Sequence, residues 1–180
     1  RLHFFHSADG LCSPEVVREL PLALALSGPA AGVAAASRVA RDLGIDRALT
    51  FDMGGTTTDV CLIVNGDAEV SADRSLAGRP LRMPAVAVES IGAGGGSIVS
   101  FDGKAIRVGP ESAGADPGPA CYSLGGQAAT ISDANMVLGR LEHGASFGGN
   151  IVLDAGRARE ALAPLARTLG LSLEATALGI

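Results

Sequence analysis

The chain contains the stretch Phe51-Asp52-Met53-Gly54-Gly55-Thr56-Thr57-Thr58-Asp59 between two segments with strand-forming side chains. Residues 48–53 are rich in β-favouring side chains, and Val60–Val64 is an unbroken apolar run, which is typical of a strand buried on both faces. The two glycines between them indicate a tight turn. Asn65-Gly66 is a hairpin signal that leads into residues 68–71, so we expect a meander of three strands.

Helices and further strands are expected on both sides of this meander. The expected helices are Pro14–Glu19 after the cap Ser13, residues 30–43 ended by Gly44, a helix capped by Ser132-Asp133 and running to Leu141, one from Asp154 to Leu169, and one starting at Ser172-Leu173-Glu174. The other expected strands are residues 85–90, 97–101 and 105–108, followed by a loop over residues 109–126. This order predicts a mixed α/β fold with antiparallel pairs rather than a Rossmann alternation. Its 180 residues, 47% hydrophobic, fit a single domain.

Composition excludes several classes of protein. A net charge of −5 and an aromatic content of 3% argue against a nucleic-acid binder, which needs a basic face or stacking platforms. The three cysteines are widely spaced and form no C-x-x-C, which favours a reducing, cytoplasmic location over a disulfide framework. The uncharged stretch 20–37 is broken by Pro21, Gly28 and Pro29, so we expect no membrane insertion.

The glycine-threonine turn predicts a phosphate site. Two glycines allow a sharp turn, and a row of hydroxyl side chains adds donors for phosphate oxygens. The donors are Gly54, Gly55, Thr56, Thr57 and Thr58. The alternative is a plain glycine hairpin whose threonines face solvent.

Two aspartates flank this turn and extend the hypothesis to a metal. Asp52 and Asp59 could hold Mg²⁺ or its waters, because that ion prefers carboxylates and keeps several waters. A plain hairpin does not explain both carboxylates. The sequence has no G-x-x-x-x-G-K-[ST] motif, and residues 92–97 lack the last glycine of a dinucleotide fingerprint, so neither familiar nucleotide motif applies.

Five separated blocks of the chain match one known family in the family's own order. They are Ser27–Gly32, Phe51–Val60, Ser90–Ile98, Gly109–Tyr122 and Asp133–Asn135. Together they resemble the hydantoinase A/oxoprolinase family. The resemblance implies the actin-like ATPase fold, in which two ribonuclease-H-like lobes close on ATP. Members of the family use ATP to open cyclic amides such as hydantoins and 5-oxoproline, and related subunits serve ATP-dependent ketone carboxylases.

The resemblance also implies roles for particular residues. Asp52 through Asp59 would be the second phosphate loop, with Asp52 and Asp59 as catalytic residues and Asp52 as the Mg²⁺ ligand. The ATP-binding residues would further include Gly92, Gly94, Gly95, Gly96 and Ser97. The similarity weakens after Phe147, so we expect a nucleotide-binding lobe over residues 1–146 and a helical continuation over residues 147–180. A B-type partner subunit and a small cyclic amide substrate are implied as well.

Three functions remain open from the sequence. The leading one is an ATP-dependent amidohydrolase subunit, which Thr57-Thr58 favours; the others are a subunit of an acetone- or acetophenone-type ketone carboxylase and a non-catalytic actin-like scaffold. No second Asp-x-Gly-Gly-Thr-type turn occurs in the sequence. We therefore expect the first phosphate loop to belong to a lobe outside this segment of a longer protein, and the segment to be inactive alone.

Weaker candidates lie elsewhere in the chain. Cys121 could be a nucleophile, which requires a lowered thiol pKa, or a packing residue. His3, His6 and Asp9 have a spacing that could suit a metal, although chain ends are often frayed.

Two further segments each have two interpretations. Asp116-Pro117-Gly118-Pro119 is either an ordered loop at a site or a rigid turn over the core. Asp133 and Asn135 belong to one of the five blocks, yet a helix start alone would explain them.

Overall fold

The computed structural model describes residues 1–8, 10–76, 78–147 and 151–180. It has two compact units: unit 1 is Arg1–Asp52 with Asp59–Ser90, and unit 2 is Met53–Thr58 with Ile91–Ile180. The chain passes between the two units three times within the segment 52–91. The expected division after residue 146 stays a prediction.

The predicted meander forms the largest sheet among the described residues. Its strands are β3 (Arg47–Met53), β4 (Thr58–Val64), β5 (Asp67–Ala68) and β10 (Glu89–Ile91), in the order β10-β4-β3 with β5 paired to β4. Asn65 and Gly66 both have positive φ, at 54° and 81°, as the predicted two-residue hairpin turn requires. The local turn signal was therefore sufficient to predict the hairpin.

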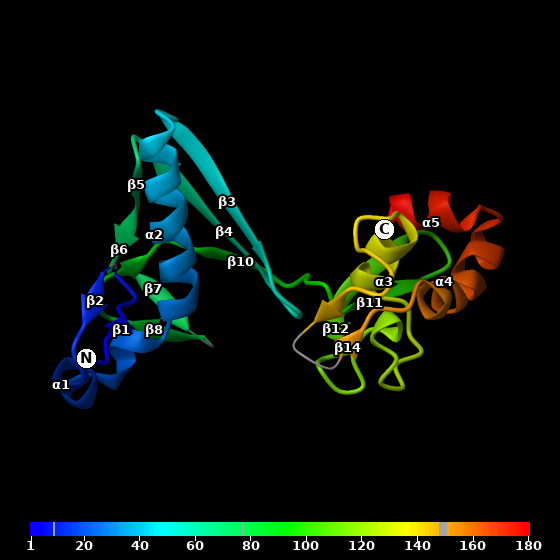
Figure 1. Ribbon diagram of the computed structural model, residues 1–180, viewed down its shortest axis with the longest axis horizontal. Helices are drawn as coiled ribbons and strands as arrows, with labels where there is room; N and C mark the ends of the chain where they lie inside the picture. Colours follow the sequence, from blue (N-terminus) through cyan, green and yellow to red (C-terminus); the bar gives the residue numbers. More distant parts are fainter. Residues whose placement is uncertain (9, 77, 148–150) are drawn as a thin grey trace. The chain divides into compact units, whose positions relative to one another are not determined.

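Helix α2 (Ser27–Asp42) packs on one face of this sheet (Figure 1). Its Ala30 and Val33 belong to the same buried cluster as Cys61 and Ile63 of β4. The prediction that β4 is buried on both faces is wrong, since Leu62 is 55% exposed. Successive strand residues point to opposite faces, and in unit 1 the helix covers only one of them.

The remaining elements of unit 1 are short. They are β1 (Phe4–Phe5) paired with β2 (Leu11–Cys12), α1 (Pro14–Glu19), the 3₁₀ helix η1 (Pro21–Leu24), β6 (Val70–Ser71) paired with β9 (Ala85–Val86), and β7 (Arg74–Leu76) paired with β8 (Arg79–Leu81). Helix α1 has its predicted bounds. Each of the strands expected over residues 68–71 and 85–90 is divided into two strands with different partners, because neighbouring residues pair with different segments.

Unit 2 combines two-stranded antiparallel sheets with helices (Figure 1). Its elements are β11 (Ser97–Phe101) antiparallel to β12 (Ile106–Ser112), the 3₁₀ helix η2 (Ala120–Tyr122), α3 (Ile131–Val137), β13 (Ser146–Phe147) paired with β14 (Ile151–Val152), α4 (Ala155–Leu169) and α5 (Leu173–Gly179). Residues 109–126, expected as a loop, thus contain the end of β12 and η2. The buried core of unit 2 contains Val99, Cys121, Met136, Leu153 and Leu162.

Helix starts follow the sequence signals in part. Ser13 lies at the N-cap of α1, although its side chain accepts no N–H bond from the described residues of that helix, and α2 begins at Ser27 instead of residue 30. Asp154 accepts N–H bonds at the start of α4, and Ser172 does so for α5, as predicted. Helix α3 is capped by Thr130 instead of Ser132-Asp133 and ends at Val137 instead of Leu141. The extended backbone of Thr130 (φ −129°, ψ 173°) lets its hydroxyl accept the N–H of Asp133, so Asp133 becomes the third residue of a capping box.

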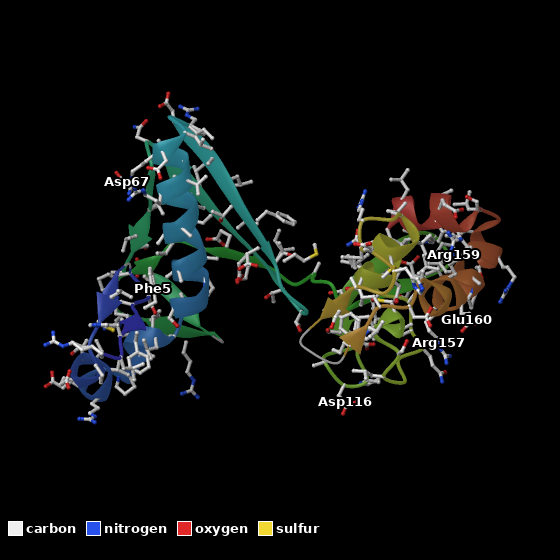
Figure 2. The ribbon with its side chains drawn as sticks, in the orientation of Figure 1. Phe5, Asp67, Asp116, Arg157, Arg159 and Glu160 are labelled. Atoms are coloured by element: carbon white, nitrogen blue, oxygen red, sulfur yellow. The ribbon has the colours of Figure 1, made fainter. Side chains whose placement is uncertain are left out.

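Exposed ion pairs lie along α4. Arg157 and Glu160 approach within 3.7 Å, and Arg159 reaches Glu174 of α5 at 3.1 Å (Figure 2). Such exposed pairs contribute little to stability. In the described part of the chain, no helix has both the length and the apolar character needed to cross a membrane.

Candidate functional site

Residues 54–57 form the turn between β3 and β4, and all four are exposed. The N–H of Gly54 donates to the carbonyl oxygen of Thr57 at 2.9 Å, which closes the turn. Thr58, the first residue of β4, is only 2% exposed. The predicted tight turn is therefore present, and its threonines differ in environment.

A glycine cluster, residues 92–97, packs directly against this turn within unit 2. The N–H of Gly95 donates to the carbonyl of Gly54 at 2.9 Å, and the N–H of Gly96 donates to that of Gly55 at 2.6 Å. A Cβ at Gly94 would lie 2.7 Å from the carbonyl oxygen of Gly54. Glycine is needed here because two backbones meet with no room for a side chain.

This packing controls where the donors of the turn point. A trans peptide directs its C=O and its N–H in opposite directions, so the two tethered carbonyls turn the N–H groups of Gly55 and Thr56 away from the glycine cluster. Among the residues that the structure describes, no protein acceptor binds the N–H of Gly55, Thr56 or Thr57. Consecutive free N–H groups in a turn form a concave site that prefers anions.

Two hydroxyls predicted as ATP ligands have partners inside the protein. Thr58 Oγ1 donates to the carbonyl of Ala93 at 2.6 Å. Ser97 is fully buried, and its Oγ accepts the N–H of Gly94 at 2.9 Å. The exposed hydroxyls of Thr56 and Thr57 are thus better placed for a ligand. The ligand roles of the glycine cluster and of Ser97 stay predictions.

The buried carboxylate of Asp133 joins two segments of unit 2. It accepts the N–H groups of Cys121 at 2.7 Å and Thr130 at 2.9 Å, and the hydroxyl of Thr130 at 2.7 Å. The first turn of α3 also contacts the glycine cluster, since the N–H of Ser132 donates to the carbonyl of Gly95 at 2.8 Å. Sequence reasoning found the helix start but missed this link, because no local signal reports a bond between residues twelve positions apart.

The two predicted metal ligands lie in unit 1, and both line a cavity of about 270 Å³. Asp52 is exposed near the end of β3, and a Cβ at Gly32 of α2 would lie 3.9 Å from its Oδ2. Asp59 is half-buried and accepts the hydroxyl of Ser90 at 2.5 Å. Thr50 lines the same cavity. The structure therefore brings both carboxylates to one pocket, whose other lining residues are mostly apolar.

This donor set fits part of a magnesium shell. Among the described residues, no group of three or more His, Cys, Asp or Glu side chains could hold a metal ion. Mg²⁺ is commonly bound by one or two carboxylates together with waters and substrate phosphates. Asp52 and Asp59 are two such carboxylates, and their role as Mg²⁺ ligands stays a prediction.

The weaker candidates have structural partners. Cys121 has no exposed surface, and burial, with the charge of Asp133, raises the pKa of its thiol, which favours packing over nucleophilic chemistry. The Nδ1 of His6 accepts the N–H of Ala8 at 3.0 Å. Asp9 lies outside the described residues, so a metal site with His3 and His6 stays a prediction.

The proline-rich loop has an exposed and a buried end. Asp116 is exposed (Figure 2), while Pro119 is fully buried and leads into η2. Gly118 has a φ of 73°, and a Cβ there would lie 3.1 Å from Tyr122 Cδ2. This packing supports the rigid-turn interpretation.

Comparison with known proteins identifies the family of the chain. The family model described as Hydantoinase/oxoprolinase matches residues 1–180. The chain therefore belongs to the hydantoinase/oxoprolinase family, as the five blocks predicted. It is 42% identical over 179 residues to caprolactamase subunit alpha of Pseudomonas jessenii, covering 98% of this chain and 26% of that protein. It is 43% identical over 136 residues to 5-oxoprolinase 1 of Arabidopsis thaliana, covering 75% of this chain and 10% of that protein.

Solved structures confirm the predicted actin-like, mixed α/β class. The crystal structure of ATP-dependent caprolactamase from Pseudomonas jessenii matches with a TM-score of 0.79 at 40% identity, covering 98% of this chain and 26% of that one. The nucleotide-free structure of acetone carboxylase matches with a TM-score of 0.77 at 35% identity, covering 99% and 25%. This chain thus spans about a quarter of the length of these relatives.

Proposed function

We propose that this chain supplies a phosphate-binding part of an ATP-dependent enzyme that opens cyclic amides. The observation that carries the proposal is the turn at residues 54–57, whose exposed N–H groups at Gly55, Thr56 and Thr57 have no acceptor among the described residues. Donors held in place before the ligand arrives stabilise a phosphoryl group without reorganising. The family membership supports ATP as that ligand, since the solved caprolactamase is described as ATP-dependent.

The residues divide into two kinds of contact in this proposal. The N–H groups of the turn and the hydroxyls of Thr56 and Thr57 bind phosphate oxygens, and Asp52 and Asp59 bind Mg²⁺ or its waters. Mg-ATP, when bound, supplies the phosphoryl group that activates the amide. The protein groups orient that phosphoryl group and offset its negative charge.

The substrate and partner follow from the relatives. Caprolactamase and 5-oxoprolinase take their names from ring amides, so we propose a small cyclic amide as substrate. The caprolactamase relative is named as a subunit alpha, which supports a B-type partner subunit. The odd number and wide spacing of the cysteines, with no C-x-x-C motif, support a reducing, cytoplasmic location. Residues 1–180 alone are proposed to be inactive, because phosphoryl transfer needs charge stabilisation on both sides of the group.

A ketone carboxylase is the second candidate, supported by the match to acetone carboxylase. The two functions share ATP use and differ in the second substrate. ATP turnover by the full-length protein with its partner subunit separates them. Turnover stimulated by lactams or 5-oxoproline supports the amidohydrolase, and turnover stimulated by acetone with bicarbonate supports the carboxylase.

Replacing Asp52 tests the proposed metal and phosphate chemistry. In the full-length protein, Asp52→Ala is expected to lower ATP turnover by about 100-fold or more, because a carboxylate beside a metal-bound phosphoryl group acts on transition-state charge. Its exposed position predicts an unchanged melting temperature. Asp42→Ala is the matched control, since Asp42 is also exposed in unit 1 and its carboxylate binds Arg38 Nε at 2.9 Å. Full ATP turnover by folded Asp52→Ala contradicts the role of Asp52.

A further inference from the structure

We propose that Thr58 is a positioning residue, whose buried hydroxyl holds the phosphate-binding turn on the glycine cluster without contacting phosphate. The inference rests on the proposed function of the turn. It gives Thr58 a different role from Thr56 and Thr57, although the three threonines are consecutive in the sequence.

The hydroxyl of Thr58 already has a hydrogen-bond acceptor within the protein. Its Oγ1 donates to the carbonyl of Ala93 at 2.6 Å, and the residue is 2% exposed. A hydroxyl has a single proton to donate, so the proton of Thr58 is not available to a phosphate oxygen. Thr56 and Thr57 are exposed and keep theirs for a ligand.

Three hydrogen bonds hold the turn against the cluster. The N–H groups of Gly95 and Gly96 bind the first two carbonyls of the turn, those of Gly54 and Gly55. Thr58 binds on the other side of residues 56 and 57 and holds the chain where the turn enters β4. The two exposed threonines are therefore fixed from both ends, which sets the direction of their N–H groups.

The glycine cluster is itself held in place by further hydrogen bonds. The N–H of Gly94 donates to the buried Ser97 Oγ, the N–H of Ser132 donates to the carbonyl of Gly95, and the N–H of Ala113 donates to the carbonyl of Gly96. These bonds connect the cluster to the start of α3 and the end of β12. The hydrogen bond from Thr58 therefore connects the turn to a part of unit 2 that other hydrogen bonds hold in place.

A set of Thr58 variants in the full-length protein tests the role, with Mg-ATP titrated by calorimetry. Thr58→Val removes the hydroxyl at nearly constant volume. We expect the Kd for ATP to rise about tenfold, because without the Thr58 hydrogen bond the N–H groups of the turn no longer point correctly at the phosphate. Thr58→Ser keeps the hydroxyl and is expected to bind within about twofold of the wild type. A merely space-filling role predicts the opposite order, because Val fills the site better than Ser.

Thr176→Val is the matched control. Thr176 is fully buried in α5 of unit 2, and its Oγ1 donates to the carbonyl of Ser172 at 2.9 Å. Losing this hydroxyl is expected to lower the melting temperature as Thr58→Val does but to leave the Kd for ATP unchanged. An equal loss of affinity in Thr176→Val overturns the proposal, because general loosening of unit 2 then explains both.

A glycine pair gives an independent readout of the same contact surface. A Cβ at Gly94 would lie 2.7 Å from both Gly54 O and Thr56 N, so Gly94→Ala must displace the turn and is expected to weaken ATP binding by at least about tenfold. Gly28→Ala is the control, since a Cβ there meets nothing within 4 Å. Wild-type affinity in a folded Gly94→Ala protein contradicts the positioning of the turn by the cluster.

These outcomes separate the inference from the function on which it rests. A wild-type protein that does not bind Mg-ATP refutes the proposed function. A wild-type protein that binds Mg-ATP, together with a Thr58→Val variant that binds it equally well, refutes the positioning role alone. Tight binding by the wild type and by Thr58→Ser, with weak binding by Thr58→Val, supports both.

Discussion

At the scale of single residues, Cys121 lies in η2 with no exposed surface and packs in the same cluster as Val99 and Met136. Its N–H donates to the carboxylate of Asp133 at 2.7 Å, so the thiol lies near a buried negative charge. Burial first and this charge second raise the pKa of the Cys121 thiol. A thiol that stays protonated is a poor nucleophile.

Alkylation of the native protein tests this reading of Cys121. At about pH 8, Cys12, which is half-buried, is expected to react with iodoacetamide, while Cys121 stays unmodified because both access and thiolate are lacking. Raising the pH by about one unit leaves Cys121 protonated and unlabelled, since the pKa of its thiol is raised. Peptide mass spectrometry identifies the labelled residue. Rapid labelling of Cys121 in folded protein contradicts the packing role.

At the scale of elements, the start of α3 depends on a fully buried carboxylate and the start of α4 on a half-buried one. Asp133 has no exposed surface and binds groups from η2 as well as its own cap. Among the described residues, the Asp154 carboxylate accepts the N–H groups of Gly156 and Arg157, both within its own helix start. We therefore expect Asp133 and Asp154 to contribute different amounts to the free energy of unfolding.

The same substitution at both positions measures this difference. Asp133→Asn is expected to lower the free energy of unfolding by about 3 kcal/mol, because charge-assisted bonds to buried N–H groups are lost and an NH₂ group faces donors. Asp154→Asn is expected to cost less than about 0.5 kcal/mol, since Asn caps helices as well as Asp does. Urea denaturation followed by circular dichroism gives both values. Equal costs refute the linking role of Asp133.

At the scale of the whole molecule, the sheet of unit 1 leaves large apolar side chains uncovered. Leu49, Phe51, Leu62 and Val64 are all exposed, and we call them the open face. They lie on β3 and β4, whose buried Cys61 and Ile63 pack with α2 on the other side. Contiguous apolar surface of this kind promotes association of a protein with itself or with hydrophobic probes.

Charges on the open face are expected to suppress this association. Leu49→Lys combined with Leu62→Lys should lower dye binding and self-association of residues 1–180, while the free energy of unfolding changes by less than about 0.5 kcal/mol. Leu171→Lys is the control, because Leu171 is exposed in unit 2. Dye fluorescence and sedimentation velocity provide the measurements. If the double variant associates as strongly as the wild type, the open face is not the surface responsible for association.

The sequence predictions that the structure confirms are those that depend on residues close together in the sequence. Helix α1 has its predicted bounds, and the Asn65-Gly66 hairpin and the Asp154 cap are present, because each depends on a few adjacent residues. The cap of α3 was misplaced by two residues, since Ser132, Asp133 and Thr130 are all good caps. Choosing among them required the backbone conformation of Thr130.

The sequence by itself determined the family, the fold class and the glycine-threonine turn, because blocks of adjacent residues carry those signals. Only the tertiary structure decided that Gly94 meets the turn some forty residues earlier, that Thr58 faces Ala93, and that one face of β4 is open. These features depend on which distant segments pack together. Periodicity and local propensity report how a segment folds, whereas the partner of a hydroxyl or the cover of a strand is set by contacts that only the folded chain creates.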